Sequence, residues 1–255
     1  MTGRISRIHW LKYLTASLVF ALGAIALTLP TQAQEISVGF GDDANLTERA
    51  VQLVILLTVL SLAPSILVMV TSFTRIVVVL SLLRSAIGLQ TAPPNMVMVS
   101  LALFLSAFIM MPTLQAAYDA GIQPLIDGDI EIDQAYEQAS EPFRDFMLSQ
   151  VREKDLMLFQ ELSGRDAPET PEDLEMAVLI PAFMISELRR AFEIGFLLYL
   201  PFLIIDLVIA SVLMSMGMMM LPPVVISLPF KLIFFVLVDG WNLVAGSLVK
   251  SFGGG

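Results

Sequence analysis

The stretch Met214-Ser-Met-Gly-Met-Met-Met-Leu-Pro-Pro223 lies between two long apolar segments, at about 191–213 and 224–249. Five of its ten residues are methionine, whose unbranched, polarizable side chain packs against surfaces of different shapes. Gly217 permits backbone angles that other residues resist, and Pro222 and Pro223 lack a backbone donor. We therefore expect an apolar, non-helical loop between two membrane-type helices.

Two interpretations of this loop are open from residue chemistry alone. Irregular backbone at membrane depth is tolerated only where it faces protein or a lumen, which favours a compliant seal inside a pore. The alternative is a methionine-rich helix end in lipid, or a hairpin turn at the membrane surface. The residues that would form the seal are Met214, Met216, Gly217, Met218, Met219 and Met220.

The composition predicts an integral membrane protein with an all-α fold. Hydrophobic residues make up 56% of the 255 residues and charged residues 15%, whereas soluble domains average about 25% charged. Several apolar runs approach the roughly 20 residues that a helix needs to cross a bilayer. The net charge of −10 argues against nucleic-acid binding, which requires a basic face.

Little in the sequence favours an enzyme or a metal site. There is no cysteine, and the one histidine, His9, lies in a segment that we expect to be removed. The remaining chain therefore offers no His/Cys ligand set and no histidine-based triad. We expect no metal, no cofactor and no catalytic residues.

Residues 1–33 have the pattern of a secretory signal peptide. Arg4, Arg7 and Lys12 precede an apolar stretch at 13–29, and small residues lead to a cleavage point after Ala33. The alternative is a first helix that is retained. Cleavage would leave the mature N-terminus outside the cytoplasm.

The remaining chain divides into three parts. Residues 34–114 hold the first two apolar helices and a connector, 115–176 form an acidic soluble helical region, and 177–255 hold the last two apolar helices with the methionine loop at 214–223. In the acidic region, one helix is expected from a Ser140 N-cap to Gly164, and another opens at Thr170-Pro-Glu-Asp173. This region either binds a partner or presents a solvated charged face.

Charged residues near the apolar segments predict topology and packing. Arg75 and Arg84 lie in the connector and place it in the cytoplasm by the positive-inside rule, with the acidic region outside. Arg189 and Arg190 then lie on the outer side, against that rule. Asp206, Lys231 and Asp239 lie inside apolar runs, where charges are usually paired or line a cavity. We therefore expect the helices to be broken and to pack mainly against protein, including other copies.

Six strings resemble the FliP family of flagellar export proteins. The first is Phe183-Met-Ile-Ser-Glu-Leu-Arg-Arg-Ala-Phe-Glu-Ile-Gly-Phe-Leu-Leu-Tyr-Leu-Pro-Phe-Leu-Ile-Ile-Asp206, and the second is the methionine stretch itself. The others are at 71–75, 83–95, 108–112 and 228–241. The match to the family extends over nearly all of the mature chain. Injectisome proteins of type III secretion share this core, so an equivalent injectisome subunit is the alternative.

The resemblance implies a channel subunit rather than an enzyme. It implies a pentameric ring that assembles with FliQ and FliR, and next to FlhB, as the export gate of the flagellar basal body. Unfolded flagellar subunits would pass through its lumen. It also implies that the helical hairpins build a cone in the inner membrane and on its periplasmic side. Met218, Met219 and Met220 would then close the lumen as a gasket.

Glu187, Asp206 and Lys231 lie in the matched strings and have three possible roles. They are ion pairs that fix ring assembly, a proton-linked site, or ordinary satisfied polar groups in a helical interface. We favour assembly pairs, because buried charge needs a partner and can specify register. Physics alone also leaves a monomeric small-solute transporter open. The sequence shows no internal repeat, which favours a multi-subunit polypeptide channel.

Overall fold

A computed structural model describes residues 46–89, 91–164, 174–218 and 220–253. The predicted signal peptide with its cleavage point at Ala33, the helix start at Thr170-Pro-Glu-Asp173, and Met219 lie outside the described residues. The chain divides into two compact units, Met1–Thr58 and Val59–Gly255. The packed core described below belongs to the second unit.

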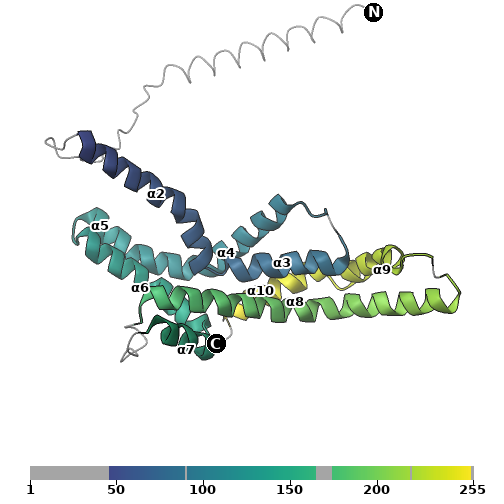
Figure 1. The fold of residues 1–255 in the computed structure, drawn as a ribbon. Coiled ribbons are helices and arrows are strands. Elements are labelled where there is room, and N and C mark those ends of the chain that lie inside the picture. Colours follow the sequence, from purple (N-terminus) through teal and green to yellow (C-terminus); the bar gives the residue numbers. More distant parts are fainter. Residues whose placement is uncertain (1–45, 90, 165–173, 219, 254–255) are drawn as a thin grey trace, which may run out of the picture. The chain divides into compact units, whose positions relative to one another are not determined.

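Every regular element in the described ranges is helical, which confirms the predicted all-α class. The elements are α2 (Leu46–Val70), α3 (Phe73–Ile87), α4 (Asn95–Ala117), the π-helical turn η1 (Tyr118–Ile122), α5 (Gln123–Asp127), α6 (Ile132–Gln150), α7 (Glu153–Ser163), α8 (Met176–Ser215), α9 (Pro223–Leu237) and α10 (Gly240–Gly253) (Figure 1).

Among the described residues, three helical stretches are long and apolar enough to cross a membrane, namely Leu53–Val70, Asn95–Asp127 and Met176–Ser215. The pair α9 and α10 would make a fourth if it counts as one span, although it is bent by 62°. The bend falls at Asp239, which has a positive φ of 51°. These stretches match the four predicted apolar segments and fit a membrane-type fold with broken helices.

The segment between the first two apolar helices is more than a connector. It contains α3, whose buried residues Ile76, Val79, Leu80 and Leu83 recur at helical spacing and face the core. Figure 1 shows α3 lying alongside α8, with which it is in contact. Polar residues interrupt the apolar run within α3, so α3 does not stand out in the sequence as a continuous apolar segment.

The single helix predicted between Ser140 and Gly164 is wrong in two respects. Helix α6 begins at Ile132, so Ser140 lies inside it, where its hydroxyl donates to the Glu137 carbonyl at 2.8 Å. The chain then breaks after Gln150 and restarts as α7. The predicted end at Gly164 is correct, because this glycine ends α7 with a left-handed φ of 64°.

Among the described residues, two hydrophobic clusters form the core of the second unit. The larger cluster joins α3, α4, α8, α9 and α10, and its fully buried members include Ile76, Leu80 and Leu248. The smaller cluster joins α6 and α8 around Met147, Leu179 and Phe183. Since α8 contributes to both clusters, it connects the apolar part of the unit to the acidic part.

Candidate functional site

The methionine loop starts with a glycine turn. Gly217 has a φ of 73°, and its N–H donates to the Met214 carbonyl at 3.1 Å. The next N–H, from Met218, donates back to the Leu213 carbonyl at 3.0 Å. These two bonds form the Schellman cap that commonly ends a helix at a glycine. At the other end, Pro222 is extended and Pro223 opens α9, as the proline pair predicts.

The described methionines of the loop are uncovered in the single chain. Met214, Met216 and Met218 are between 43% and 62% exposed, and Met220 is 98% exposed. A concentration of exposed, adaptable apolar side chains marks an interaction surface. A seal inside a pore requires methionines that are exposed in this way. It also requires several chains, because a single chain does not enclose a pore.

Arg75 is the centre of a buried polar network. Arg75 and Glu187 are both 0% exposed, and the Arg75 Nε donates to Glu187 Oε2 at 2.8 Å while Nη2 donates to Glu187 Oε1. Nη2 also donates to Gln150 Oε1 at 3.1 Å. Burial lowers the pKa of Arg75, against the opposing effect of Glu187, yet an arginine stays charged at neutral pH.

The sequence did not predict the ion pair of Arg75 with Glu187. From the sequence we expected Arg75 and Arg84 only to determine the topology of the chain. A signal was available, because Arg75 lies four residues before Val79 and so on the apolar face of α3. Arg84 has a local role. Its Nη1 donates to the Pro93 carbonyl at 3.3 Å and to the Asn95 side chain, bracing the turn between α3 and α4.

A second polar cluster ties α7 to α8. The Ser186 hydroxyl donates to Asp155 Oδ2 at 2.6 Å, and the Arg152 side chain donates to the same oxygen at 2.6 and 2.9 Å. Burial by itself would raise the pKa of Asp155. The hydrogen bonds from Ser186 and Arg152 outweigh it and hold the pKa of this carboxyl below its ordinary value.

A third cluster joins α8, α9 and the end of α3. Lys231 is 3% exposed, and its Nζ donates to Asp206 Oδ2 at 2.7 Å and to the Ala86 carbonyl at 3.2 Å. The Ser227 hydroxyl donates to Asp206 Oδ1. The Ala86 carbonyl belongs to the last turn of α3, where helix carbonyls lack helical partners and a cation is favourable.

From the sequence, we grouped Glu187, Asp206 and Lys231 as charged residues in the matched strings. In the structure two of them pair with each other, and the third pairs with a residue outside the group. Asp206 pairs with Lys231, and Glu187 pairs with Arg75, in both cases within one chain. Arg189 pairs with Glu193 at 2.9 Å on an exposed face of α8. A role of these charges in assembly stays a prediction.

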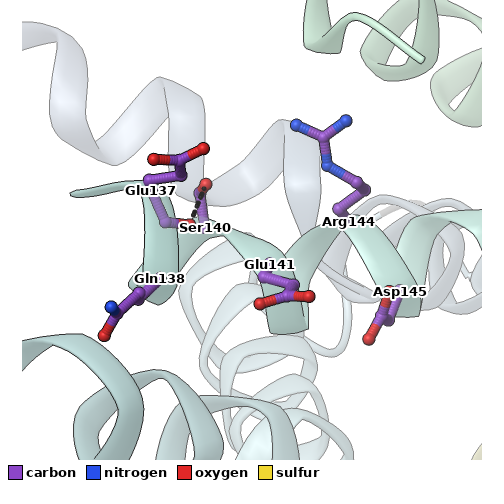
Figure 2. A pocket seen from close by; sticks show the side chains of 6 residues that line it. All are labelled: Glu137, Gln138, Ser140, Glu141, Arg144 and Asp145. Atoms are coloured by element: carbon purple, nitrogen blue, oxygen red, sulfur yellow. Dashed lines mark hydrogen bonds between the residues drawn. The ribbon is translucent and has the colours of Figure 1, made fainter. Parts of the chain in front are cut away.

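The acidic region presents a polar hollow of about 350 Å³ on α6. It is lined by Glu137, Gln138, Ser140, Glu141, Arg144 and Asp145, which all belong to this one helix (Figure 2). Figure 2 shows Arg144 pointing to the opposite side of α6 from Glu141 and Asp145, and its Nη1 donates to the Leu174 carbonyl. Within the part of the chain that the structure describes, no cluster of three His, Cys, Asp or Glu side chains could hold a metal ion.

These helices, ion pairs and the methionine loop lie in a region that matches a known protein family. The FliP family model matches residues 56–248, which include α3, the pairs Arg75–Glu187 and Lys231–Asp206, and the methionine loop. The chain belongs to the FliP family. Members of this family are components of the flagellar type III export gate and are not enzymes. Membership of the FliP family therefore excludes the monomeric small-solute transporter, which the residues alone left as a possible function.

Curated relatives with FliP names are similar in sequence to this chain over most of their length. The flagellar biosynthetic protein FliP of Caulobacter vibrioides is 62% identical over 93% of this chain and 91% of its own length. The protein of the same name from Bacillus subtilis is 52% identical over 85% of this chain and 98% of its own length. That of Rhizobium meliloti is 56% identical over 77% of this chain and 81% of its own length.

Proposed function

We propose that this chain is a channel-forming subunit of the flagellar export gate and that its methionine loop seals the lumen. One observation carries the proposal: Met220 is 98% exposed at the tip of a loop that a glycine cap and a proline pair hold at the end of α8. The other described methionines of the loop are exposed as well, and removing such a group of apolar side chains from water is favourable. Loops from several copies that converge on one axis would cover them in this way.

The exposed helix faces support a multi-copy assembly. Large apolar residues remain uncovered along α8 from Phe192 onward, including Phe196, Ile204 and Leu207. Further ones lie on α4 and α10, including Phe104 and Trp241. A ring of five copies with FliQ and FliR, next to FlhB, would bury these faces in the inner membrane and on its periplasmic side.

The mechanism follows from methionine chemistry. In the resting gate, the side chains of Met214, Met216, Met218, Met219 and Met220 narrow the lumen and exclude water and ions, since apolar constrictions close by dewetting. An arriving unfolded flagellar subunit displaces the loops. The flexible thioether chains then pack around it whatever its sequence, because methionine surfaces tolerate varied partners.

The test is the ion permeability of cells that carry assembled complexes. Replacing Met218, Met219 and Met220 together by Ala removes the apolar bulk, and we expect ions to leak. Replacing the same three by Leu keeps the volume, and the barrier should hold. Met96→Ala alters an exposed methionine outside the loop and serves as the control. An intact barrier in assembled Ala complexes would overturn the gasket.

The subunit composition is tested separately. The tagged chain is co-expressed with FliQ and FliR, and its native mass is measured in mild detergent. We expect a discrete complex that contains several copies of this chain and both partners. A monomer that binds neither partner would overturn the assembly.

A further inference from the structure

All five N–H donors of the Arg75 guanidinium are used inside the protein. Three of them bind Glu187 and Gln150, as described above. The remaining two, on Nη1, donate to the Ser251 carbonyl at 3.2 Å and to the Ser251 hydroxyl at 3.1 Å. An arginine carries no further N–H donors in its side chain. A buried cation is therefore fully satisfied only when Ser251 is in place.

Phe252 covers one face of the same group. The Arg75 Cζ lies 3.7 Å from the centroid of the Phe252 ring, a cation–π arrangement. The Phe252 ring also stacks with the ring of Phe146 in α6, with centroids 6.1 Å apart and planes 20° apart. The last turn of α10 thus contacts α3 and α6 at one point.

This contact lies at the C-terminal end of α10. The carbonyl of Ser251 belongs to the last turn of α10, where carbonyls lack helical partners and attract a cation. Ser251 follows Arg75 by 176 positions, whereas Glu187 follows it by 112. The ion pair can therefore form before α10 exists, but two donors of a charged and buried group would then lack acceptors.

We propose that the C-terminal turn of α10 is a latch that closes over the Arg75–Glu187 pair and locks α3, α6 and α8 together. An unsatisfied donor on a buried charge is strongly unfavourable, so removing the latch should loosen helices far from the chain end. Docking of the last turn of α10 onto Arg75 is then the step that rigidifies the protomer. This device concerns one chain and is independent of the methionine gasket.

Hydrogen exchange of the full-length protein in detergent tests the latch. Deleting residues 251–255 should accelerate exchange about tenfold or more in α3 near Arg75 and in α8 near Glu187, besides α10 itself. Deleting residues 254–255 alone leaves the latch intact and is the matched control. Acceleration confined to α10 would mean that the chain end merely frays, and it would overturn the proposal.

A milder pair of variants covers the case in which the deletion prevents folding. Ser251→Ala removes one of the two acceptors and should accelerate exchange in α3 and α8 about threefold. Ser247→Ala changes an exposed serine of the same helix and should leave exchange in α3 and α8 unchanged. Equal effects of the two variants in α3 and α8 would overturn the latch.

A charge-free background separates the latch from general packing. In the double variant Arg75→Met and Glu187→Met, no buried cation needs the Ser251 acceptors. Adding Ser251→Ala to this background should then have no further effect on exchange in α8. If Ser251→Ala accelerates exchange in α8 as much as in the wild-type background, Ser251 does not act through Arg75 and the proposal fails.

Discussion

Arg75 and Glu187 lie 112 positions apart in the sequence and form an ion pair in which both side chains are completely buried. This pair joins α3 to α8 close to Phe183, a member of the smaller core cluster. Because α8 also contributes to the larger cluster, the pair stands where the apolar and acidic parts of the second unit meet. A buried pair stabilises little relative to apolar residues, but it is very sensitive to the loss of one partner.

Removing the carboxylate should be strongly destabilising. Glu187→Ala leaves the Arg75 cation buried without its counter-charge, and we expect about 3–5 kcal/mol lower free energy of unfolding. Denaturant titration of the detergent-solubilised protein measures it. Arg189→Ala breaks the exposed pair with Glu193 and should change stability by less than about 1 kcal/mol. Similar effects of the two variants would contradict the central place of Arg75 and Glu187.

The close approach of α3 and α8 depends on a glycine. A Cβ on Gly195 would lie 2.3 Å from Leu82 Cδ1 and 3.1 Å from Leu82 Cβ, so Gly195→Ala must push the helices apart or displace Leu82. We expect about 1–3 kcal/mol of destabilisation. Adding Leu82→Ala should recover part of this loss in a double-mutant cycle. Additive effects of the two substitutions would show that Leu82 is not the obstacle.

Gly217, in the cap of the methionine loop, differs from Gly195. It has open space where a Cβ would lie, but its φ is +73°. Gly217→Ala should therefore act through backbone strain alone and lower stability by about 1–2 kcal/mol. Gly246 also has open space around it and lies within α10, where Ala should be neutral or stabilising by up to about 1 kcal/mol. Thermal unfolding of both variants compares the two positions directly, and equal midpoints would contradict the strained cap.

Lys231 links the loop-bearing helices and provides a test of assembly. Lys231→Ala removes the partner of Asp206 and the donor to the Ala86 carbonyl, so α9 should lose its fixed position on α3 and α8. We expect few complete rings by native mass measurement after co-expression with FliQ and FliR. Lys250→Ala, at an exposed position, should assemble normally. Complete rings of Lys231→Ala would rule out an essential assembly role of the pair with Asp206.

Acid should weaken the contact between α7 and α8. The pKa of Asp155 is held below its ordinary value of 3.8, so its contribution to stability is present above about pH 3.8 and is lost as the pH falls through the lower folded pKa. Asp155→Asn should therefore reduce the free energy of unfolding at pH 7, and this difference from wild type should shrink in acid. Asp145→Asn, at an exposed position of α6, should change stability little. A difference for Asp155→Asn that is constant with pH would contradict this role.

Sequence reasoning succeeded where the signal is local. The apolar segments, the turn residues Gly217 and Pro223, and the end of α7 at Gly164 follow from residues within a few positions of each feature. It failed at Ser140, because a serine two residues before a proline is a common helix start, but both residues are also tolerated inside a helix, as Ser140 and Pro142 are in α6. It also failed at Arg75, whose positive charge was interpreted through topology rather than through the apolar face on which it lies.

The amino-acid sequence by itself determined the helical class, the apolar segments, the methionine loop and the membership of the FliP family, since periodicity, composition and long matching strings are properties of the chain. Only the tertiary structure decided that Glu187 pairs with Arg75, that α3 lies in the core, and that Ser251 and Phe252 complete the buried charge network. Those contacts join residues more than 100 positions apart. Helix packing brings such residues together, and the local patterns on which sequence reasoning relies do not encode the choice of partner.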